Sequence, residues 1–487
     1  PEVPDRFFVN DIKADLHDPD TVYVVVDDHK SGDFSPYVLK STDRGETWES
    51  IAGDLPDRHI LWRIVQDHVK HELLFLGTEF GVFFTVNGGG KWTKLKGGAP
   101  NIPFRDLAIQ ARENDLVGAT FGRSFYVLDD YTPLRDVTEN MLENDTVLFP
   151  VRRTHWSVPK RPLGCAEEGC VGSQGDDFFV APNPDFGAVF TYYLPETIAT
   201  QKSARQDAEK DAIAANDDVA FPSWDQIRAE GLEDEPAIIL TVRDSEGAIV
   251  RHVAGPAEAG FHRVAWDMTY PTLRPWQPVE EGMEPEPLGP GVLVAPGTYT
   301  VSMAALTDGV PEDLDQTQSF ELVSIREPTL TANTQEQRVI FEAQADELLR
   351  AAEGTTLAID EILAEIAAIK EVLVRSRGEG SFFEIADSIG KRLNQQRDLL
   401  ANNEMQQSYN DVQVMTVAAR AFHARFVPMS SAYGPTPDQR KSLATARETY
   451  DGVVAELDSI VGEEYAALKT ALDEAKVPWT PGRGIQR

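Results

Sequence analysis

The chain has 487 residues, of which 80 are acidic and 45 basic, so its net charge is −35 at pH 7. A chain of this length predicts about three domains. The acidic excess argues against nucleic acid and anionic membranes as partners, because both bind basic surfaces. No run of about 18 apolar residues is present, which excludes a conventional membrane-spanning helix. We therefore expect a highly soluble extracytoplasmic protein (periplasmic, cell-surface or secreted) whose export signal is not among these residues.

The first 137 residues contain short runs rich in β-branched and aromatic residues, separated by turn residues, which is the pattern of antiparallel strands. The runs form three groups of four: 9–16, 21–28, 37–43 and 47–53; 62–68, 72–79, 81–87 and 91–97; 104–110, 115–122, 124–130 and 133–137. This spacing predicts three successive four-stranded sheets within residues 1–140.

Two of the predicted hairpins share one motif. Residues 41–50 are STDRGETWES and residues 85–94 are TVNGGGKWTK, and both fit Ser/Thr-x-Asp/Asn-x-Gly-x-x-Trp. The Asp or Asn side chain accepts hydrogen bonds from backbone N–H groups of the turn, Gly permits a positive φ, and Trp covers the next strand. The structural residues of the motif are Ser41, Asp43, Gly45 and Trp48 in the first copy, and Thr85, Asn87, Gly89 and Trp92 in the second.

The motif resembles the Asp-box, or BNR, repeat of β-propeller proteins such as sialidases and the sortilin (VPS10) propeller. The first copy matches fully, whereas the second has Asn87 for Asp and Lys91 for Thr. The resemblance implies blades of a β-propeller in the C-terminal portion of an exported bacterial protein, in a group loosely described as glycosyl-hydrolase-like. Because three blades do not close a ring, we expect upstream blades of the same polypeptide as partners.

Blade topology places four residues on the face opposite the motif, where ligands usually bind. These ligand-face candidates are Arg63, Glu79, Arg105 and Arg123, with Arg63 and Arg105 aligned between blades. Sialidase-like enzymes hold a carboxylate with arginines, so the resemblance implies part of such a clamp, and structural salt bridging is the alternative. No catalytic residue can be assigned, no nucleotide-binding, serine-hydrolase or zinc-protease motif occurs, and we expect neither cofactor nor metal.

Residues 141–180 are rich in Pro and loop-forming residues and predict a linker. The chain's two cysteines, Cys165 and Cys170, lie in it. A bridge between them would close a small loop and suit an exported protein, so they are a disulfide candidate. Free thiols are the alternative, and a metal site lacks further ligands.

Residues 181–328 predict a β-sandwich with an insertion, helical or disordered, near 199–232. The order of residues 242–251, 260–267 and 296–301 is similar to the Ig-like domain of flagellar hook-capping proteins. This resemblance implies an Ig-like module without chemistry of its own. Trp266 and Tyr299 are then expected in its core rather than in a sugar-stacking platform.

Residues 332–480 show apolar stripes of helical period, at Ile359, Ile362, Ile366, Ile369 and Leu373 and again from Leu443 to Ile460. We expect an antiparallel bundle of three or four helices, with an oligomerising coiled coil as the alternative.

The predicted fold class is thus multidomain β plus α: a partial propeller of about three blades, an Ig-like sandwich and a C-terminal helical bundle. The predicted function is binding or scaffolding, with recognition of a protein or glycan ligand and no catalysis in this part of the protein. The alternative is a sialidase-like glycoside hydrolase whose catalytic centre lies largely in upstream blades.

Overall fold

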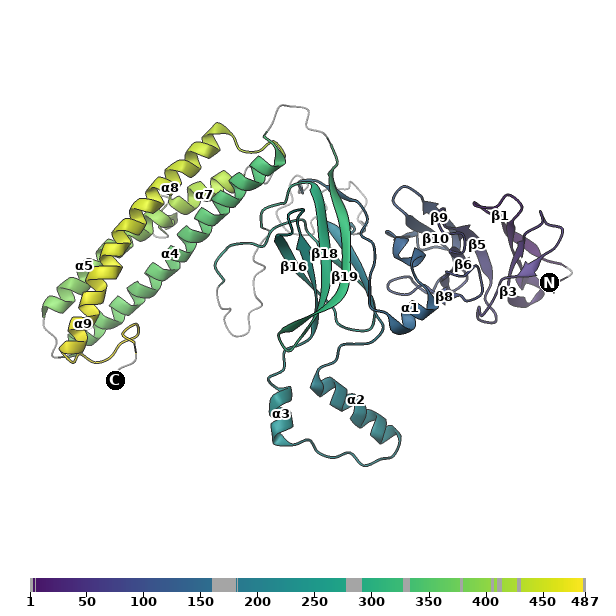
Figure 1. The fold of residues 1–487 in the computed structure, drawn as a ribbon, viewed down its shortest axis with the longest axis horizontal. Helices are drawn as coiled ribbons and strands as arrows, with labels where there is room; N and C mark the ends of the chain where they lie inside the picture. Colours follow the sequence, from purple (N-terminus) through teal and green to yellow (C-terminus); the bar gives the residue numbers. More distant parts are fainter. Residues whose placement is uncertain are drawn as a thin grey trace.

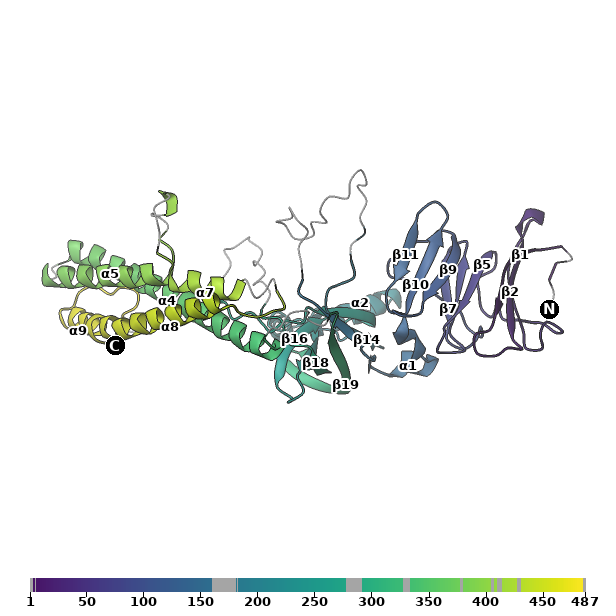
Figure 2. The same cartoon turned by 90° about the horizontal axis from the view of Figure 1, so that it is seen from above.

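A computed structural model describes residues 3–4, 6–159, 181, 183–276, 291–326, 333–376, 380–403, 407–409, 414–426 and 431–484. It is a mixed β and α structure, as predicted. Three parts follow one another along its long axis: a stack of sheets, a two-sheet sandwich and a group of long helices (Figures 1 and 2).

The N-terminal part consists of three antiparallel sheets in chain order. Sheet 1 contains β1 (Phe8–Ala14), β2 (Val22–Asp28), β3 (Asp33–Ser41) and β4 (Glu49–Ser50); sheet 2 contains β5 (Leu61–Gln66), β6 (Leu74–Thr78), β7 (Gly81–Thr85) and β8 (Thr93–Lys94); sheet 3 contains β9 (Phe104–Gln110), β10 (Asp115–Thr120) and β11 (Phe125–Leu128). Figure 2 shows them stacked face to face, which is how neighbouring propeller blades pack.

Sheet 3 has three strands in this part of the chain, and the fourth strand expected at 133–137 is not formed. A 3₁₀ helix, η2 (Thr132–Arg135), lies there instead. Pro133 lacks a backbone N–H and so cannot donate to a strand ladder. The side chain of Pro133 is buried, so this segment closes the sheet stack without extending it.

Two apolar cores hold the stack together, one in each gap between sheets. Tyr23, Val25 and Val38 of sheet 1 meet Ile64, Leu76 and Phe83 of sheet 2 in the first core. Phe75 and Val82 of sheet 2 meet Phe104, Leu107 and Leu116 of sheet 3 in the second core. Because side chains alternate across a strand, sheet 2 contributes to both cores and is buried on both faces.

Helix α1 (Glu139–Asn144) leads from the stack into the sandwich. One sandwich sheet has the order β12 (Val147–Leu148), β14 (Ala188–Leu194), β17 (Gly260–Trp266); the other has β13 (Thr154–Trp156), β19 (Val310–Ser324), β18 (Gly297–Thr307), β15 (Ala237–Arg243), β16 (Ile249–Gly255). β12 and β13 lie in the segment predicted to be a linker. They join the sheets because Leu148 and Trp156 are buried in the common core.

Trp266 and Tyr299 are also in this core, with their ring centroids 5.5 Å apart. Between β14 and β15 the chain forms α2 (Gln201–Ala214) and α3 (Trp224–Glu230). Cys165 and Cys170 lie outside the described residues.

The C-terminal helices share one apolar core. They are α4 (Gln335–Arg375), α5 (Gly380–Leu400), α7 (Val417–Phe426), α8 (Pro437–Leu457), the π-helical segment η4 (Asp458–Tyr465) and α9 (Ala466–Glu474). Thr334 and Thr436 cap α4 and α8 with complete capping boxes.

Arg338 of α4 attaches the helices to the sandwich. Its guanidinium donates to the carbonyls of Leu293 and Val294, at 2.9 and 3.1 Å, and lies 5.4 Å from the ring centroid of Trp156. Within the described residues, none of the helices combines the length and apolar character needed to cross a membrane.

Candidate functional site

Each sheet of the stack carries a β-bulge in its first strand. The ladder pairing skips Asn10 in β1, Trp62 in β5 and Arg105 in β9. A bulge bends the strand and redirects the skipped side chain. An amide, an indole and a guanidinium therefore occupy equivalent positions in successive sheets, and we call these three residues the bulge row.

Each bulge side chain contacts a residue at the end of the second strand of its own sheet or directly after it. The contacts are Asn10 Nδ2 to Asp27 Oδ2 at 2.8 Å, Trp62 Nε1 to Glu79 Oε2 at 3.0 Å, and Arg105 Cζ to the Phe121 ring centroid at 5.5 Å. Equivalent positions are thus in contact in all three sheets, although the interacting groups differ from sheet to sheet.

The bulge row is continuous across the sheets. Asn10 Nδ2 also donates to the carbonyl of Leu61 at 2.7 Å, next to Trp62. The ring of His29 meets Trp62 edge-on at 6.0 Å, and His29 Nδ1 contacts the Asp27 carboxylate. One end of the stack therefore presents a connected line of polar and aromatic groups.

Arg105 is the charged member of the bulge row and also its most exposed member. Its Cζ lies 3.4 Å from the ring centroid of Trp62, and its Nη2 lies 3.9 Å from Glu79 Oε2. The Arg105 side chain remains 43% exposed, whereas Trp62 is buried. Stacking fixes the guanidinium plane on the indole and leaves its N–H donors available to a ligand.

The residues that follow the bulge in each strand form a second line, Asp11, Arg63 and Asp106. Arg63 Nη1 lies 2.9 Å from Asp11 Oδ1, and Arg63 Nε lies 2.6 Å from Asp106 Oδ1. The backbone N–H of Ile64 also donates to Asp11 at 3.1 Å. Arg63 is therefore an electrostatic tie across all three sheets.

The four ligand-face candidates thus have different environments. Glu79 and Arg105 join the bulge row, and Arg63 forms the tie beside it. Arg123 is exposed in the turn after β10, and its side chain has no hydrogen bond or ion pair with the residues that the structure describes. In the observed register Arg105 is equivalent to Trp62, and not to Arg63 as the sequence alignment predicts.

The two repeated hairpins have the same turn geometry on the opposite side of the sheets. In the first, the Gly45 N–H donates to Ser41 Oγ at 2.8 Å and the Thr47 N–H donates to Asp43 Oδ1 at 2.8 Å. The corresponding bonds in the second copy are Gly89 N–H to Thr85 Oγ1 at 3.0 Å and Lys91 N–H to Asn87 Oδ1 at 3.0 Å. Asn thus replaces Asp as acceptor in the second copy.

The tryptophans of the two hairpins differ in what covers them. Trp92 is buried against sheet 1 and donates from Nε1 to the carbonyl of Ile51 at 2.8 Å. Trp48 is half-buried and donates to Gly45 of its own turn at 3.1 Å. Gly89 has a φ of +103°, and a Cβ there would lie 2.8 Å from Ile51, so this close packing also requires glycine.

Asp15 ties sheet 1 to sheet 2 at the end remote from the bulge row. Its Oδ2 accepts from Tyr23 at 2.8 Å, from Gln66 at 2.8 Å and lies 2.9 Å from His71 Nε2. Burial raises the pKa of Asp15, but hydrogen bonds from the His17 N–H, Tyr23 and Gln66 outweigh it and lower that pKa to about 2. His71 is therefore part of a tie between sheets.

Asp67 repeats this arrangement between sheet 2 and the segment after sheet 3. It is fully buried and accepts from Tyr131 at 2.7 Å and from Arg135 Nε and Nη2 at 2.9 and 2.8 Å. Burial raises the pKa of Asp67, but Arg135 and Tyr131 lower it to about 2. These carboxylates have the role of structural anions.

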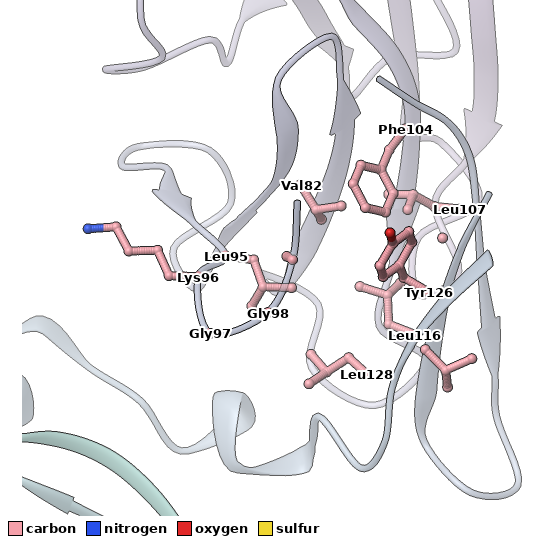
Figure 3. Close-up of a pocket in the computed structure, with 13 residues that line it drawn as sticks. Val82, Leu95, Lys96, Gly97, Gly98, Phe104, Leu107, Leu116, Tyr126 and Leu128 are labelled. Carbon is pink, nitrogen blue, oxygen red and sulfur yellow. The ribbon is translucent and has the colours of Figure 1, made fainter. Parts of the chain in front are cut away.

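A cavity of about 240 Å³ opens between sheets 2 and 3. Its walls are mainly apolar, and the side chain of Lys96 points away from it (Figure 3). The lining comes from Val82, Leu95, Phe104, Leu107, Leu116, Tyr126, Leu128 and the glycine loop at 97–98. Such an apolar lining offers no pair of groups for acid–base catalysis. In the described parts of the chain, no group of three or more His, Cys, Asp or Glu is placed to hold a metal ion.

No protein-family model matches the chain. It is 33% identical over 99 residues to the xyloglucanase Xgh74A of Acetivibrio thermocellus, a match covering 18% of this chain and 12% of that enzyme. Among solved structures it is similar to the GH74 xyloglucanase from Xanthomonas campestris (13% identity, 69% of this chain, 40% of that chain, TM-score 0.21) and to YCF48 bound to D1 peptide (18% identity, 27% and 40%, TM-score 0.21). The chain spans 9–12% of the length of the curated relatives it matches. Its demonstrated sequence similarity is therefore to a small part of xyloglucanases.

Proposed function

We propose that this chain is part of an extracytoplasmic β-propeller protein that binds a protein or glycan ligand at the bulge row and performs no catalysis with the residues described. The observation that carries the proposal is the recurrence of a bulge at one position in three sheets, with Arg105 stacked 3.4 Å from Trp62. Bulges that redirect side chains are common at binding sites.

The three sheets are proposed to be blades of a larger ring. The outer face of sheet 1 exposes Val9 and Ile12, which are 50% and 62% accessible, and the outer face of sheet 3 exposes Phe125 and Val127, at 69% and 52%. Apolar sheet faces of this kind are normally covered. The half-buried Trp48 supports the same conclusion, because its equivalent, Trp92, is buried by a preceding sheet.

The proposed organisation behind the blades keeps the layout predicted from the sequence, with one adjustment. Blades occupy 1–140, an Ig-like sandwich extends to 328 and a helical bundle occupies 332–480. The sandwich begins at β12, within the predicted linker at 141–180. The repeated hairpins are proposed to be Asp-box turns that fasten the blades on the side away from the ligand.

A glycoside hydrolase is the second candidate, favoured by the 33% identity to a xyloglucanase over 99 residues. Such enzymes need two carboxylates that flank the scissile bond. The carboxylates near the bulge row all have local partners: Asp11 and Asp106 pair with Arg63, Asp27 accepts from Asn10, and Glu79 accepts from Trp62. Their engagement supports binding as the role of this part of the chain.

The test uses the complete polypeptide and two arrays, one of neutral and acidic glycans and one of synthetic peptides. We expect saturable binding that Arg105→Ala and Trp62→Ala each weaken about tenfold or more, because Arg105 is the exposed contact and the buried Trp62 fixes the plane of its guanidinium. Arg112→Ala is the matched control, because Arg112 is exposed at the opposite end of sheet 3 and pairs only with Glu113 among the described residues. Unchanged binding in both row variants contradicts the proposal, and sugar release from xyloglucan or aryl glycosides favours the hydrolase.

A further inference from the structure

A helical arm, residues 200–236, leaves the sandwich between β14 and β15. It contains α2 and α3 and extends away from both the sheet stack and the C-terminal helices (Figure 1). Thr200 and Ser223 cap the two helices through side-chain bonds to the N–H groups of Ser203 and Gln226. The local sequence therefore specifies the helices, although no other part of the described chain covers them.

The arm has no core of its own. None of the 14 residues of α2 is buried, and the single buried residue of α3 is Glu230. A helix of this length is marginal in water without a packed face. Order in the arm therefore depends on contacts other than an apolar core of its own.

Large apolar side chains are instead displayed toward solvent around the connection between α2 and α3. Phe221 and Trp224 are 81% and 77% exposed. Ile213 near the end of α2 and Val219 in the connection are also exposed, at 65% and 41%. Two large aromatic side chains exposed within four residues of sequence are typical of an interaction site.

Ion pairs fasten the base of the arm, where the start of α2 meets the end of α3. Arg205 donates to both oxygens of Glu230, at 2.7 and 2.8 Å, and to Glu209 at 2.6 Å. The N–H of Gln201 donates to Glu233 at 2.8 Å. Bidentate Arg–carboxylate pairs fix geometry as well as distance, so the end of α3 is held against the start of α2.

The charge of the arm defines the partner's chemistry. Residues 200–236 contain ten acidic and four basic residues, a net charge of −6. Between Lys210 and Arg228, the stretch that contains the aromatic residues, every charged residue is acidic. We infer that the arm docks, through Phe221 and Trp224, into an apolar pocket rimmed by Lys and Arg on another protein. This inference is independent of the function proposed for the bulge row.

The experiment uses the whole chain and a fluorescein-labelled amphipathic helical peptide of Lys and Leu, with a Glu and Leu peptide of the same pattern as the charge control. Fluorescence anisotropy measures the dissociation constant. The double variant Phe221→Ser/Trp224→Ser is expected to weaken binding of the Lys–Leu peptide roughly tenfold or more. Since this variant keeps the net charge of −35, general attraction to an acidic protein does not change.

Trp479→Ser is the matched control, because Trp479 is 52% exposed but belongs to the C-terminal segment. The Trp479→Ser variant is expected to bind the Lys–Leu peptide as tightly as the unaltered chain does. The double variant Asp217→Asn/Asp218→Asn is expected to bind this peptide more weakly and with a smaller dependence on salt concentration. Equal binding by the Phe221/Trp224 variant overturns the inference, as does equal binding of the Glu–Leu peptide. A blue shift of Trp224 fluorescence with phosphatidylcholine vesicles, absent in the double variant, identifies a membrane surface in place of a protein and also overturns it.

Discussion

Replacing Arg63 by Met tests whether this arginine ties the sheets together or binds a ligand. The Asp11 side chain is 4% exposed and would keep only the half-exposed Lys13, at 4.0 Å, as a charged partner. Breaking a buried pair on one side costs about 3–5 kcal/mol. The Arg63 side chain is 28% exposed and the Ile64 N–H still donates to Asp11, so we expect a local loss of about 2 kcal/mol.

Hydrogen exchange followed by mass spectrometry measures this loss in the intact chain. A local destabilisation of about 2 kcal/mol accelerates exchange of β1 and β5 amides roughly thirtyfold at 25 °C. Peptides from the C-terminal helices are the internal reference, since the exchange there should not change.

Asp106→Asn removes the other half of the tie and serves as the control. The Asp106 side chain is 57% exposed, and exposed ion pairs contribute about 0.2–1 kcal/mol, so exchange should accelerate about fivefold at most. Equal acceleration by Arg63→Met and Asp106→Asn would refute the reasoning from burial. Loss of ligand binding in Arg63→Met with unchanged exchange would show that Arg63 is a ligand contact.

Two other predictions concern the sheet stack. Hydrogen bonds lower the pKa values of Asp15 and Asp67 to about 2, so the stability that each carboxylate provides is complete above about pH 5 and is lost as the pH falls toward about 2, at up to about 2 kcal/mol each. Urea unfolding measured at a series of pH values should show this loss, and the free energy of unfolding should fall less steeply with acid in Asp67→Asn. An unchanged acid slope in this variant contradicts the role assigned to Asp67. Gly118→Ala should destabilise the packing of sheets 2 and 3 by about 1–3 kcal/mol, because the added Cβ would lie 2.6 Å from Phe104 Cδ1. The control Gly452→Ala lies in α8 with open space around it and should stabilise the protein by up to about 1 kcal/mol. Thermal denaturation measures both variants, and a shift of the melting temperature in the same direction for both would contradict the close packing inferred at Gly118.

Local features of this chain were predictable from its sequence, because their interactions lie within a few residues. The Ser41 and Asp43 bonds that shape the first hairpin all fall inside residues 41–47. The second hairpin has the same bonds although Asn87 replaces Asp, since an amide oxygen accepts as a carboxylate does. Helix starts at Thr334 and Thr436 follow equally local capping rules.

The bulge row could not be located in the same way. A bulge adds one unpaired residue, and a shift of one residue sends side chains to the other face of a sheet. The sequence alignment therefore matched Arg105 with Arg63, although the bulges place it with Trp62. Asn10 and Trp62 were not predicted as site residues because each resembles an ordinary strand residue; an alignment of the three strand starts that allows one insertion would have found them.

Short or proline-containing strands were the other source of error. β12 and β13 contain two and three residues, too few for any periodicity, and only tertiary burial of Leu148 and Trp156 identifies them. Residues 133–137 (PLRDV) were predicted to be a strand, but Pro133 and its buried position favour a 3₁₀ turn.

The most direct test of the central claim is a cryo-electron microscopy structure of the complete polypeptide. We predict further four-stranded sheets stacked on the outer faces of sheets 1 and 3, with Trp48 covered and with Trp62 and Arg105 facing the open end of the ring. A structure in which those faces pack against something other than sheets, or in which another segment of the polypeptide covers Arg105, would contradict the account.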